Sequence, residues 1–279
     1  MANYTAADIK ALREKTGAGM MDVKKALDEA NGDAEKATEI IRVKGLKGVA
    51  KREGRAASDG LVAIEVVADG AGETGVMVEL NSETDFVAKN QVFVTLSEKV
   101  LAAAVASGAA DVESLLAAPV DDTTVGGLVD ETAATLGEKL VLRRVARVSG
   151  EKVASYLHRT AKDLPPQVGV LVATDAAGAE VARDVAMHIA AYSPQYLTRE
   201  DVPADVVESE RRIAEETSRN EGKPEAALPK IIEGRMNGFF KESVLLDQAF
   251  ARDPKTTVGK VVEGSGGKVT AFARFRVGA

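Results

Sequence analysis

Hydrophobic positions in the first 45 residues recur every three or four residues, which predicts three short helices. Thr5 is suited to cap the first helix, and the glycines of TGAG (16–19) are suited to end it. NGD (31–33) supplies a glycine terminator for the second helix and Asp33 as a cap for the third. The third helix is expected to stop at Gly45. Three helices with tight turns make a small bundle of a kind that usually docks against a partner.

A basic stretch follows, RVKGLKGVAKREGR (42–55), with six basic residues and one acid. Glycines interrupt it, so it is interpreted as a solvated hinge. Basic side chains could also follow a phosphate backbone, but the stretch has no aromatic side chain that could stack on bases. The pattern therefore favours a hinge.

The rest of the chain contains an internal repeat of strands and helices. The matched segments are LVAIEVV (61–67) with VASYLH (153–158), GVMVEL (75–80) with GVLVAT (169–174), FVTLSEKVLAAAVAS (93–107) with VARDVAMHIAAY (181–192), TTVGGLVDE (123–131) with TTVGKVVEG (256–264), and LVLRRVARV (140–148) with VTAFARFRV (269–277). Each copy reads as a strand hairpin, an apolar helix, a short helix and an arginine-rich strand with one buried face. The predicted fold class is α+β, with two copies side by side and helices on one side of antiparallel sheet.

An insertion in the second copy is predicted to form a protruding helical hairpin at about residues 200–245. Residues 204–221 are helical and highly charged, GKP (222–224) turns the chain, and a second helix runs to about Ser243. Pro229 can start that helix but would kink it from an interior position. The predicted domains are the helical module with its basic linker (1–55), a first core unit (56–148) and a second core unit that carries the hairpin (149–279).

Composition narrows the function classes. The net charge of the 279 residues is -7, but residues 1–55 hold 12 Lys and Arg against 9 Asp and Glu, while the remainder is acidic; this argues against the whole chain being a nucleic-acid binder. The chain has no Cys, which excludes disulfides and thiolate metal sites and fits a reducing compartment. MANYTAADIK does not resemble a signal peptide, and no apolar run approaches the roughly 20 residues that cross a bilayer. We expect a soluble, cytoplasmic protein without membrane contact.

Catalytic motifs are not supported by their context. GAGETG (70–75) matches G-x-G-x-x-G but joins two predicted strands, so it is interpreted as a hairpin turn, and no P-loop occurs. Asp184 and His188 lie four residues apart on a helix and are interpreted as a solvated or core-edge ion pair. His158 ends a strand near an exposed loop and, from residue chemistry alone, is interpreted as structural. We therefore expect no enzymatic activity, no cofactor and no bound metal.

NSETDFVAKN (81–90) places a large aromatic residue, Phe86, at a helix entrance in a chain with only 4% aromatic residues. In one interpretation its polar neighbours cap the helix and Phe86 packs into the core. In the other, Phe86 projects as a wedge into a partner's pocket, with Asp85 bonding nearby donors. The second alternative requires that the core be filled by other apolar residues: Val87, Phe93 and Leu96.

Four motifs in order resemble the bacterial translation elongation factor Ts family, and the resemblance covers the chain from end to end. They are TGAGMMDVKKALDEANGD (16–33) for the family's N-terminal module, ETDFVAKN (83–90) for its signature, VAMHIAA (185–191) for a second-half helix and EGRM (233–236) for its helical hairpin. The resemblance implies an α+β fold with a UBA-like three-helix module, a two-fold repeated core and a protruding hairpin. It also implies a guanine nucleotide exchange factor for the GTPase elongation factor Tu, with no nucleotide site of its own.

The resemblance further implies residue roles. The segment with which the family dislodges the partner's magnesium matches Thr84, Asp85, Phe86 and Val87, where the Phe side chain enters an apolar pocket behind the partner's switch region. His158 falls where the family has a contact from its second half. Met20 and Met21, which as helix neighbours cannot both face a small core, lie in the module that docks on the partner's nucleotide domain.

A rival hypothesis belongs to a different function class. It is an adaptor or RNA-associated protein that uses residues 42–55 on phosphates. Salt dependence separates the two hypotheses, because phosphate binding falls steeply with salt and insertion of an apolar wedge does not.

Overall fold

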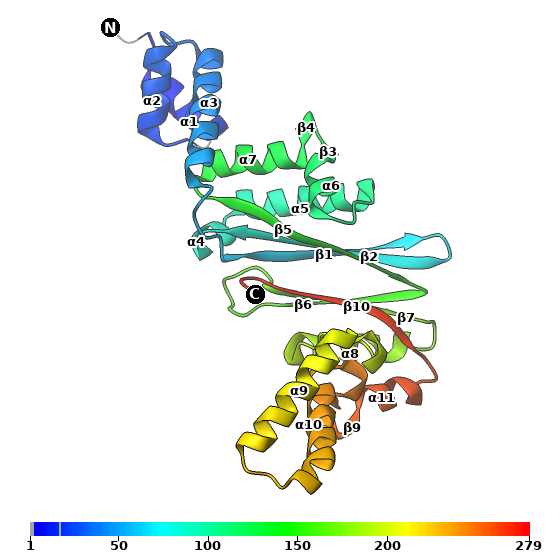
Figure 1. Ribbon diagram of the computed structural model, residues 1–279. Helices are drawn as coiled ribbons and strands as arrows, with labels where there is room; N and C mark the ends of the chain where they lie inside the picture. The colour runs from blue at the N-terminus through cyan, green and yellow to red at the C-terminus, as the bar shows by residue number, and fades with distance from the viewer. Residues whose placement is uncertain (1–2, 17) are drawn as a thin grey trace.

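The computed structural model describes residues 3–16 and 18–279. Met1, Ala2 and Gly17, the last of which belongs to the TGAG segment expected to end the first helix, lie outside the described residues. Two antiparallel sheets lie face to face at the centre, helices cover the outer side of each, and the N-terminal helices and a helical hairpin lie at opposite ends (Figure 1). The α+β class expected from the sequence is confirmed.

The N-terminal module packs three helices around a small core of Leu, Val and Ala side chains. Its helices are α1 (Ala6–Thr16), α2 (Met20–Glu29) and α3 (Ala34–Arg52). The predicted caps are present: Thr5 and Asp8 exchange hydrogen bonds, and the Asp33 carboxylate accepts from two backbone N–H groups at the start of α3. Gly32, with φ +88°, allows the left-handed turn between α2 and α3.

The expected end of the third helix at Gly45 and the expected hinge at residues 42–55 are wrong. Helix α3 continues to Arg52, because its second half packs on the body of the protein. Val49 contacts the first core cluster, and a Cβ on Gly45 would lie 2.7 Å from the Ala134 Cβ. Gly45 therefore permits a close helix contact and does not terminate a helix.

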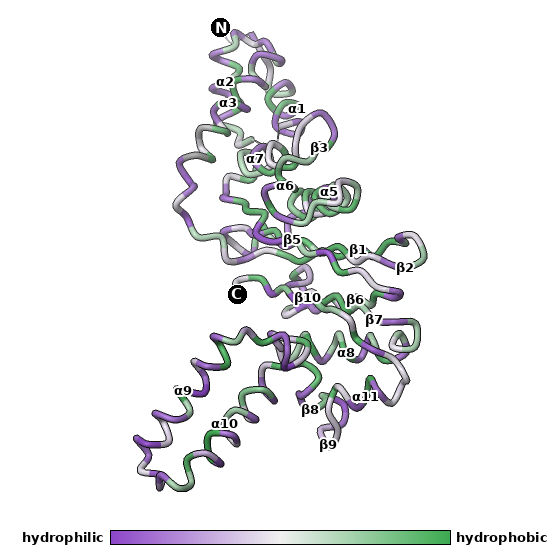
Figure 2. Tube along the Cα trace, turned by 45° about the vertical axis from the view of Figure 1, so that its right-hand side comes forward, coloured by the Kyte–Doolittle hydropathy of each residue, from purple (hydrophilic) through white to green (hydrophobic). Residues whose placement is uncertain are grey.

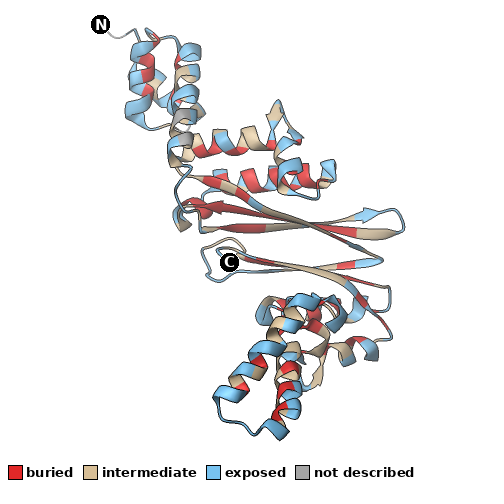
Figure 3. Ribbon diagram, in the orientation of Figure 1, coloured by how far each residue is buried: buried red, intermediate tan, exposed pale blue. Residues whose placement is uncertain are grey.

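The first half of the repeat is a sheet with the strand order β1-β2-β5. Its elements are β1 (Asp59–Asp69), β2 (Gly72–Ser82), α4 (Asp85–Ala88), α5 (Gln91–Ser107), α6 (Val112–Ala117), β3 (Pro119–Val120), β4 (Thr123–Thr124), α7 (Val125–Leu136) and β5 (Leu140–Gly150). Helices α5, α6 and α7 bury their apolar faces against one side of this sheet (Figure 3). GAGETG lies at the β1–β2 hairpin, as predicted.

The second half repeats this arrangement in the equivalent order β10-β7-β6. Its elements are β6 (Lys152–His158), β7 (Val168–Thr174), α8 (Ala179–Tyr192), α9 (Ala204–Asn220), α10 (Leu228–Ser243), β8 (Ala249–Phe250), β9 (Asp253–Thr257), α11 (Val258–Gly264) and β10 (Val269–Arg276), with 3-10 turns at Arg199–Asp201, Glu225–Ala227 and Leu245–Asp247. The expected two-fold repeat of hairpin, helix and final strand is confirmed.

Equivalent arginines of the final strands make equivalent contacts. Arg147 of β5 donates to the carbonyl of Ala104 in α5 at 2.9 Å, and Arg274 of β10 donates to the carbonyl of Ala190 in α8 at 3.1 Å. Each arginine lies opposite the second residue of its repeat strand, GVMVEL or GVLVAT. In both halves an arginine therefore ties the final strand to the last turns of the covering helix.

The two sheets pack against each other, so the expected side-by-side placement of the repeats is corrected to a face-to-face one. Met77, Leu171 and Phe275 belong to a buried cluster between the sheets. A Cβ on Gly75 would lie 2.5 Å from a Leu171 methyl, and one on Gly169 would lie 2.4 Å from a Val62 methyl. The first glycine of each repeat strand thus lets the sheets approach closely, and the face opposite the helices is also buried.

Helices α9 and α10 form the predicted hairpin, which projects from the second half with a polar outer surface (Figure 2). Its interior is a small cluster that includes Ala214, Leu228, Ile232 and Met236. Pro229 lies in the first turn of α10, where a proline is tolerated. The division into domains at residues 55 and 148 stays a prediction. In the described part of the chain, every helix is too short or too polar to span a bilayer.

Candidate functional site

Helix α4 is a single turn that directly follows β2, and Thr84 is its N-cap. The Thr84 hydroxyl accepts a hydrogen bond from the Val87 N–H at 3.4 Å. Two backbone bonds close the turn, from Ala88 N–H to Thr84 O and from Lys89 N–H to Asp85 O, both 3.1 Å. Because the strand ends in the buried Ser82, the backbone enters the turn from a fixed position.

Successive side chains of this turn point in opposite directions. Val87 is 8% exposed and belongs to the core of the first half, together with Phe93 and Leu96. Phe86 is 73% exposed. Since other residues fill the core, the structure decides between the two interpretations of Phe86: its ring projects from the surface.

Lys89 lies over the exposed ring. Its Nζ is 4.9 Å from the Phe86 centroid, 3.5 Å from an Asp85 oxygen and 3.4 Å from an oxygen of Asp163 in the β6–β7 loop. Desolvation would lower the pKa of Lys89, but the two carboxylates outweigh it and raise the pKa. The ammonium therefore stays charged and connects α4 to the second half of the molecule.

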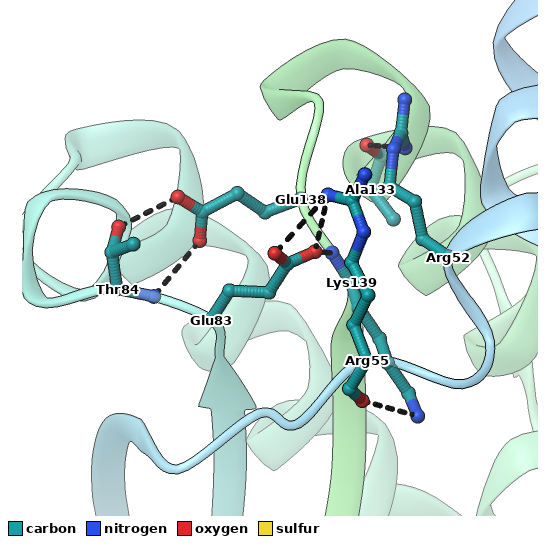
Figure 4. A network of polar contacts seen from close by, with 7 residues as sticks. All are labelled: Arg52, Arg55, Glu83, Thr84, Ala133, Glu138 and Lys139. Carbon is teal, nitrogen blue, oxygen red and sulfur yellow. Dashed lines mark hydrogen bonds and ion pairs between the residues drawn. The ribbon is translucent and has the colours of Figure 1, made fainter.

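Two carboxylates join the start of α4 to the turn between α7 and β5 by hydrogen bonds. Glu138, in the turn between α7 and β5, accepts hydrogen bonds from Thr84, and Glu83 accepts from the backbone of Lys139 and from Arg55 (Figure 4). Burial would raise the pKa of Glu83, but the hydrogen bonds from Lys139 and Arg55 overcome this effect and the pKa is lowered. Glu83 is therefore ionised at neutral pH.

His158 is exposed at the end of β6, an edge strand of the second sheet. Its Nδ1 is 3.2 Å from the Tyr156 hydroxyl, and the two rings stack with centroids 6.1 Å apart. The loop that begins at His158 carries Asp163, the partner of Lys89. The structure thus brings the loop of His158 to the helix of Phe86.

Met20 and Met21 are both exposed at the start of α2, where the sequence required only one of them to be. They lie in the N-terminal module, and α3 of that module contacts α7. The predicted site residues therefore come from three parts of the molecule. Thr84, Asp85, Phe86 and Val87 form one turn, His158 lies on a loop joined to it, and the methionines lie on a separate surface.

The basic segment 42–55 is largely committed to internal contacts. Arg42 pairs with Glu131, Lys44 pairs with Glu29, Arg52 donates to the carbonyl of Ala133, and Arg55 pairs with Glu83. These contacts leave fewer free charges for a phosphate backbone and lend no support to the RNA-associated alternative.

The expected ion pair of Asp184 and His188 is not formed. His188 is completely buried, its Nε2 lies 2.8 Å from the Gln248 Oε1, and its Nδ1 accepts from the Ala251 N–H. Asp184 pairs with Arg252. Burial lowers the pKa of His188 despite the Gln248 contact, so the ring is a neutral structural element.

Within the described residues, no three His, Asp or Glu side chains group in a way that could hold a metal ion. What the site offers is an exposed aromatic ring on a rigid turn with charged groups around it. Such a surface is suited to insert into an apolar pocket of another macromolecule.

Sequence reasoning missed Lys89, Glu138 and Asp163 as parts of this site. A signal existed for Lys89, because it lies three residues after Phe86 and four after Asp85 on the same turn. Glu138 is 54 residues from Thr84, and Asp163 is 74 residues from Lys89, so no local pattern connects them.

Comparison with known proteins places these residues in a family context. A model of the family described as Elongation factor TS matches residues 83–279. Proteins named elongation factor Ts from Beutenbergia cavernae, Micrococcus luteus and an Arthrobacter species are 74%, 67% and 66% identical to this chain, each with the full length of both chains covered.

Proposed function

The chain belongs to the elongation factor Ts family, and from this premise we propose that it is a guanine nucleotide exchange factor for the GTPase elongation factor Tu. It binds the GDP form of that partner, displaces the partner's Mg²⁺, and so promotes release of GDP and its replacement by GTP. The protein itself breaks no covalent bond and needs no cofactor.

The observation that carries the proposal is the exposure of Phe86 on a turn whose neighbouring side chain is buried. Val87 anchors the turn in the core, and Thr84 caps it, so the ring is presented without the need to order a loop first. Asp85 pairs with Lys89 but keeps an exposed carboxylate beside the ring, to which donors of the partner can bind. An aromatic ring that fills a desolvated pocket contributes about 2 kcal/mol or more to binding.

Exchange follows from a difference in affinity between two states of the partner. If the factor binds nucleotide-free elongation factor Tu more tightly than the GDP complex, then by linkage it weakens GDP binding by the same ratio. Magnesium accepts little deviation from octahedral geometry, so a wedge that shifts its ligands weakens the metal and the phosphates together. Entry of GTP then expels the factor.

Two further surfaces add contacts in this proposal. Met20 and Met21 present exposed, flexible side chains on the N-terminal module, which suits docking on the nucleotide domain of the partner. His158 provides a contact from the second half, on the loop that Lys89 joins to α4. Binding at separate surfaces orients the wedge toward its pocket.

The experiment that tests the proposal is release of a fluorescent GDP from elongation factor Tu, with the wild-type protein and with Phe86→Ala. Wild type should accelerate release, and the variant should be slower by roughly 30-fold or more, the factor that matches a hot-spot aromatic. Circular dichroism of both proteins checks that the fold is retained. If wild type leaves the release rate unchanged, the proposal is wrong.

The same assay at increasing salt tests the rival class. Acceleration that depends on an apolar wedge should persist at moderate salt, whereas binding of residues 42–55 to RNA phosphates would fall steeply. Tight, salt-sensitive RNA binding together with no effect on GDP release would favour the RNA-associated alternative.

A further inference from the structure

The N-cap of α4 is held by a residue from another part of the chain. Glu138 accepts hydrogen bonds from the Thr84 hydroxyl at 2.6 Å and from the Thr84 N–H at 3.1 Å (Figure 4). The next residue, Lys139, donates its N–H to the Glu83 carboxylate at 2.7 Å. Residues 83–84 and 138–139 are thus joined by three hydrogen bonds, all of which have a glutamate side-chain oxygen as the acceptor.

The same contact continues to the end of the N-terminal module. The Lys139 ammonium donates to the carbonyl of Arg55 at 3.0 Å and to that of Glu53. The Arg55 guanidinium donates in turn to the Glu83 carboxylate at 3.2 Å. The α7–β5 turn therefore connects the helix of Phe86 with the segment that follows α3. Figure 4 shows these contacts between the start of α4 and the α7–β5 turn.

An isolated turn of helix needs such support. Forming the first turn of a helix is unfavourable, and a four-residue helix gains only a few backbone hydrogen bonds in return. The stability of α4 is therefore marginal without contacts to other segments. Phe86 adds no packing to its stability because the ring is exposed. The Thr84 hydroxyl donates its proton to an oxygen of Glu138. A lone pair of the Thr84 hydroxyl oxygen then stays free to accept the hydrogen bond from the Val87 N–H.

We propose that Glu138 is a positioning residue for Phe86. Its carboxylate holds the Thr84 cap, keeps α4 ordered in the free protein, and so spares the complex the cost of ordering the wedge on binding. Glu138 acts through Thr84 and needs no contact with the partner. The functional half of this inference rests on the proposed exchange role of Phe86.

The first test uses the free protein and does not depend on any partner. Hydrogen–deuterium exchange is measured at the amides of residues 87–89 in wild type, Glu138→Ala, Glu138→Gln and Glu113→Ala. Glu113 is an exposed carboxylate of α6, at the other end of α7 from α4, and serves as the matched control (Figure 1). Loss of the charge-assisted contact should speed exchange at 87–89 by about tenfold in Glu138→Ala.

Glu138→Gln should give a smaller increase, because the amide oxygen can accept one of the two hydrogen bonds without the charge. Glu113→Ala should leave these amides unchanged. If Glu138→Ala does not fold, the Gln variant carries the test. Unchanged exchange at 87–89 in every folded Glu138 variant would overturn the proposal.

The second test separates positioning from general stability. GDP release from elongation factor Tu at subsaturating factor, where the rate depends on how tightly the factor binds, is measured for Glu138→Ala with Phe86 present and in the Phe86→Ala background. A positioning role predicts release about tenfold slower when Phe86 is present and no further slowing when it is absent. Equal slowing in both backgrounds would mean a merely structural role and would overturn the inference.

The two failures are distinguishable. If wild type does not accelerate GDP release, the proposed function fails, and the amide exchange still decides whether Glu138 orders α4. If wild type and Phe86→Ala differ as expected but Glu138→Ala behaves as wild type in both assays, the exchange role stands and the positioning role is wrong.

Discussion

Gly45 of α3 lies so close to Ala134 of α7 that a Cβ on the glycine would be 2.7 Å from the alanine Cβ. The contact is flanked by the Arg42–Glu131 ion pair and by the hydrogen bond from Arg52 to the carbonyl of Ala133. Since α3 is continuous through Arg52, this contact sets where the N-terminal module sits on the core.

We predict that Gly45→Ala loosens this joint while the rest of the protein stays folded. The added methyl cannot be accommodated unless α3 and α7 move apart, although alanine is a better helix former by about 1 kcal/mol. Small-angle scattering should show a more extended molecule, and limited proteolysis should cut faster after α3. Gly234→Ala in α10 is the control, because no atom lies within 4 Å of its added methyl and the site is away from the α3–α7 contact. Identical behaviour of both variants would contradict the role given to Gly45.

Phe86 and Phe93 should differ sharply in their effect on stability. Phe86 is exposed and Phe93 is fully buried in the core of the first half. Phe93→Ala should therefore lower the free energy of unfolding by about 3–5 kcal/mol, and Phe86→Ala should change it by less than about 0.5 kcal/mol. Urea unfolding followed by circular dichroism measures both. A large loss for Phe86→Ala would show that the ring packs in solution.

The free energy of unfolding should depend on the ion pair between the buried Glu79 and Arg144. Glu79 has no exposed surface, Arg144 donates to it at 2.6 Å, and the same guanidinium lies 4.5 Å from the Phe275 ring across the sheet interface. Arg144→Leu should cost about 3–5 kcal/mol because it leaves a buried carboxylate unpaired.

The exposed Lys99–Asp121 pair is the control for this prediction, and Lys99→Ala should cost at most about 1 kcal/mol. The midpoint of urea unfolding compares the two variants. A double variant, Glu79→Leu with Arg144→Leu, removes both charges. It should lose less stability than the summed losses of Glu79→Leu alone and Arg144→Leu alone. Strict additivity would argue against a direct pair.

Burial of His188 should make the free energy of unfolding decrease at acid pH. Burial lowers its folded-state pKa, whereas the unfolded ring titrates near 6.5. Below about pH 6.5 the unfolded chain takes up a proton that the folded chain resists, so this contribution to stability is complete above that pH and is lost as the pH falls toward the folded pKa. Protonation of Nδ1 would also remove the acceptor of the Ala251 N–H.

Melting temperatures between about pH 5 and pH 7.5 test this, with His188→Gln as the comparison. The difference between wild type and variant should shrink as the pH falls, because the variant has no imidazole to protonate. A difference that is constant with pH would show that His188 does not titrate in this window.

Local sequence patterns predicted most of the elements and several caps. Thr5 and Asp33 cap helices as predicted, because a cap is a contact between residues two or three positions apart. The repeat of GVMVEL and GVLVAT predicted two equivalent hairpins, because strands with similar side chains bury similar faces. The error at Gly45 has the same origin: a glycine is a helix terminator by local propensity, and only the position of Ala134 explains its use inside α3.

The sequence by itself therefore determined most of the helices and strands, the repeat and the position of an aromatic residue at a helix entrance, because these depend on neighbours within a few residues. Tertiary structure decided that Val87 fills the core while Phe86 does not, and that the two sheets meet face to face through Gly75 and Gly169. It also brought Glu138 to Thr84. Each of these depends on atoms contributed by segments far apart in the chain, whose packing no local periodicity records.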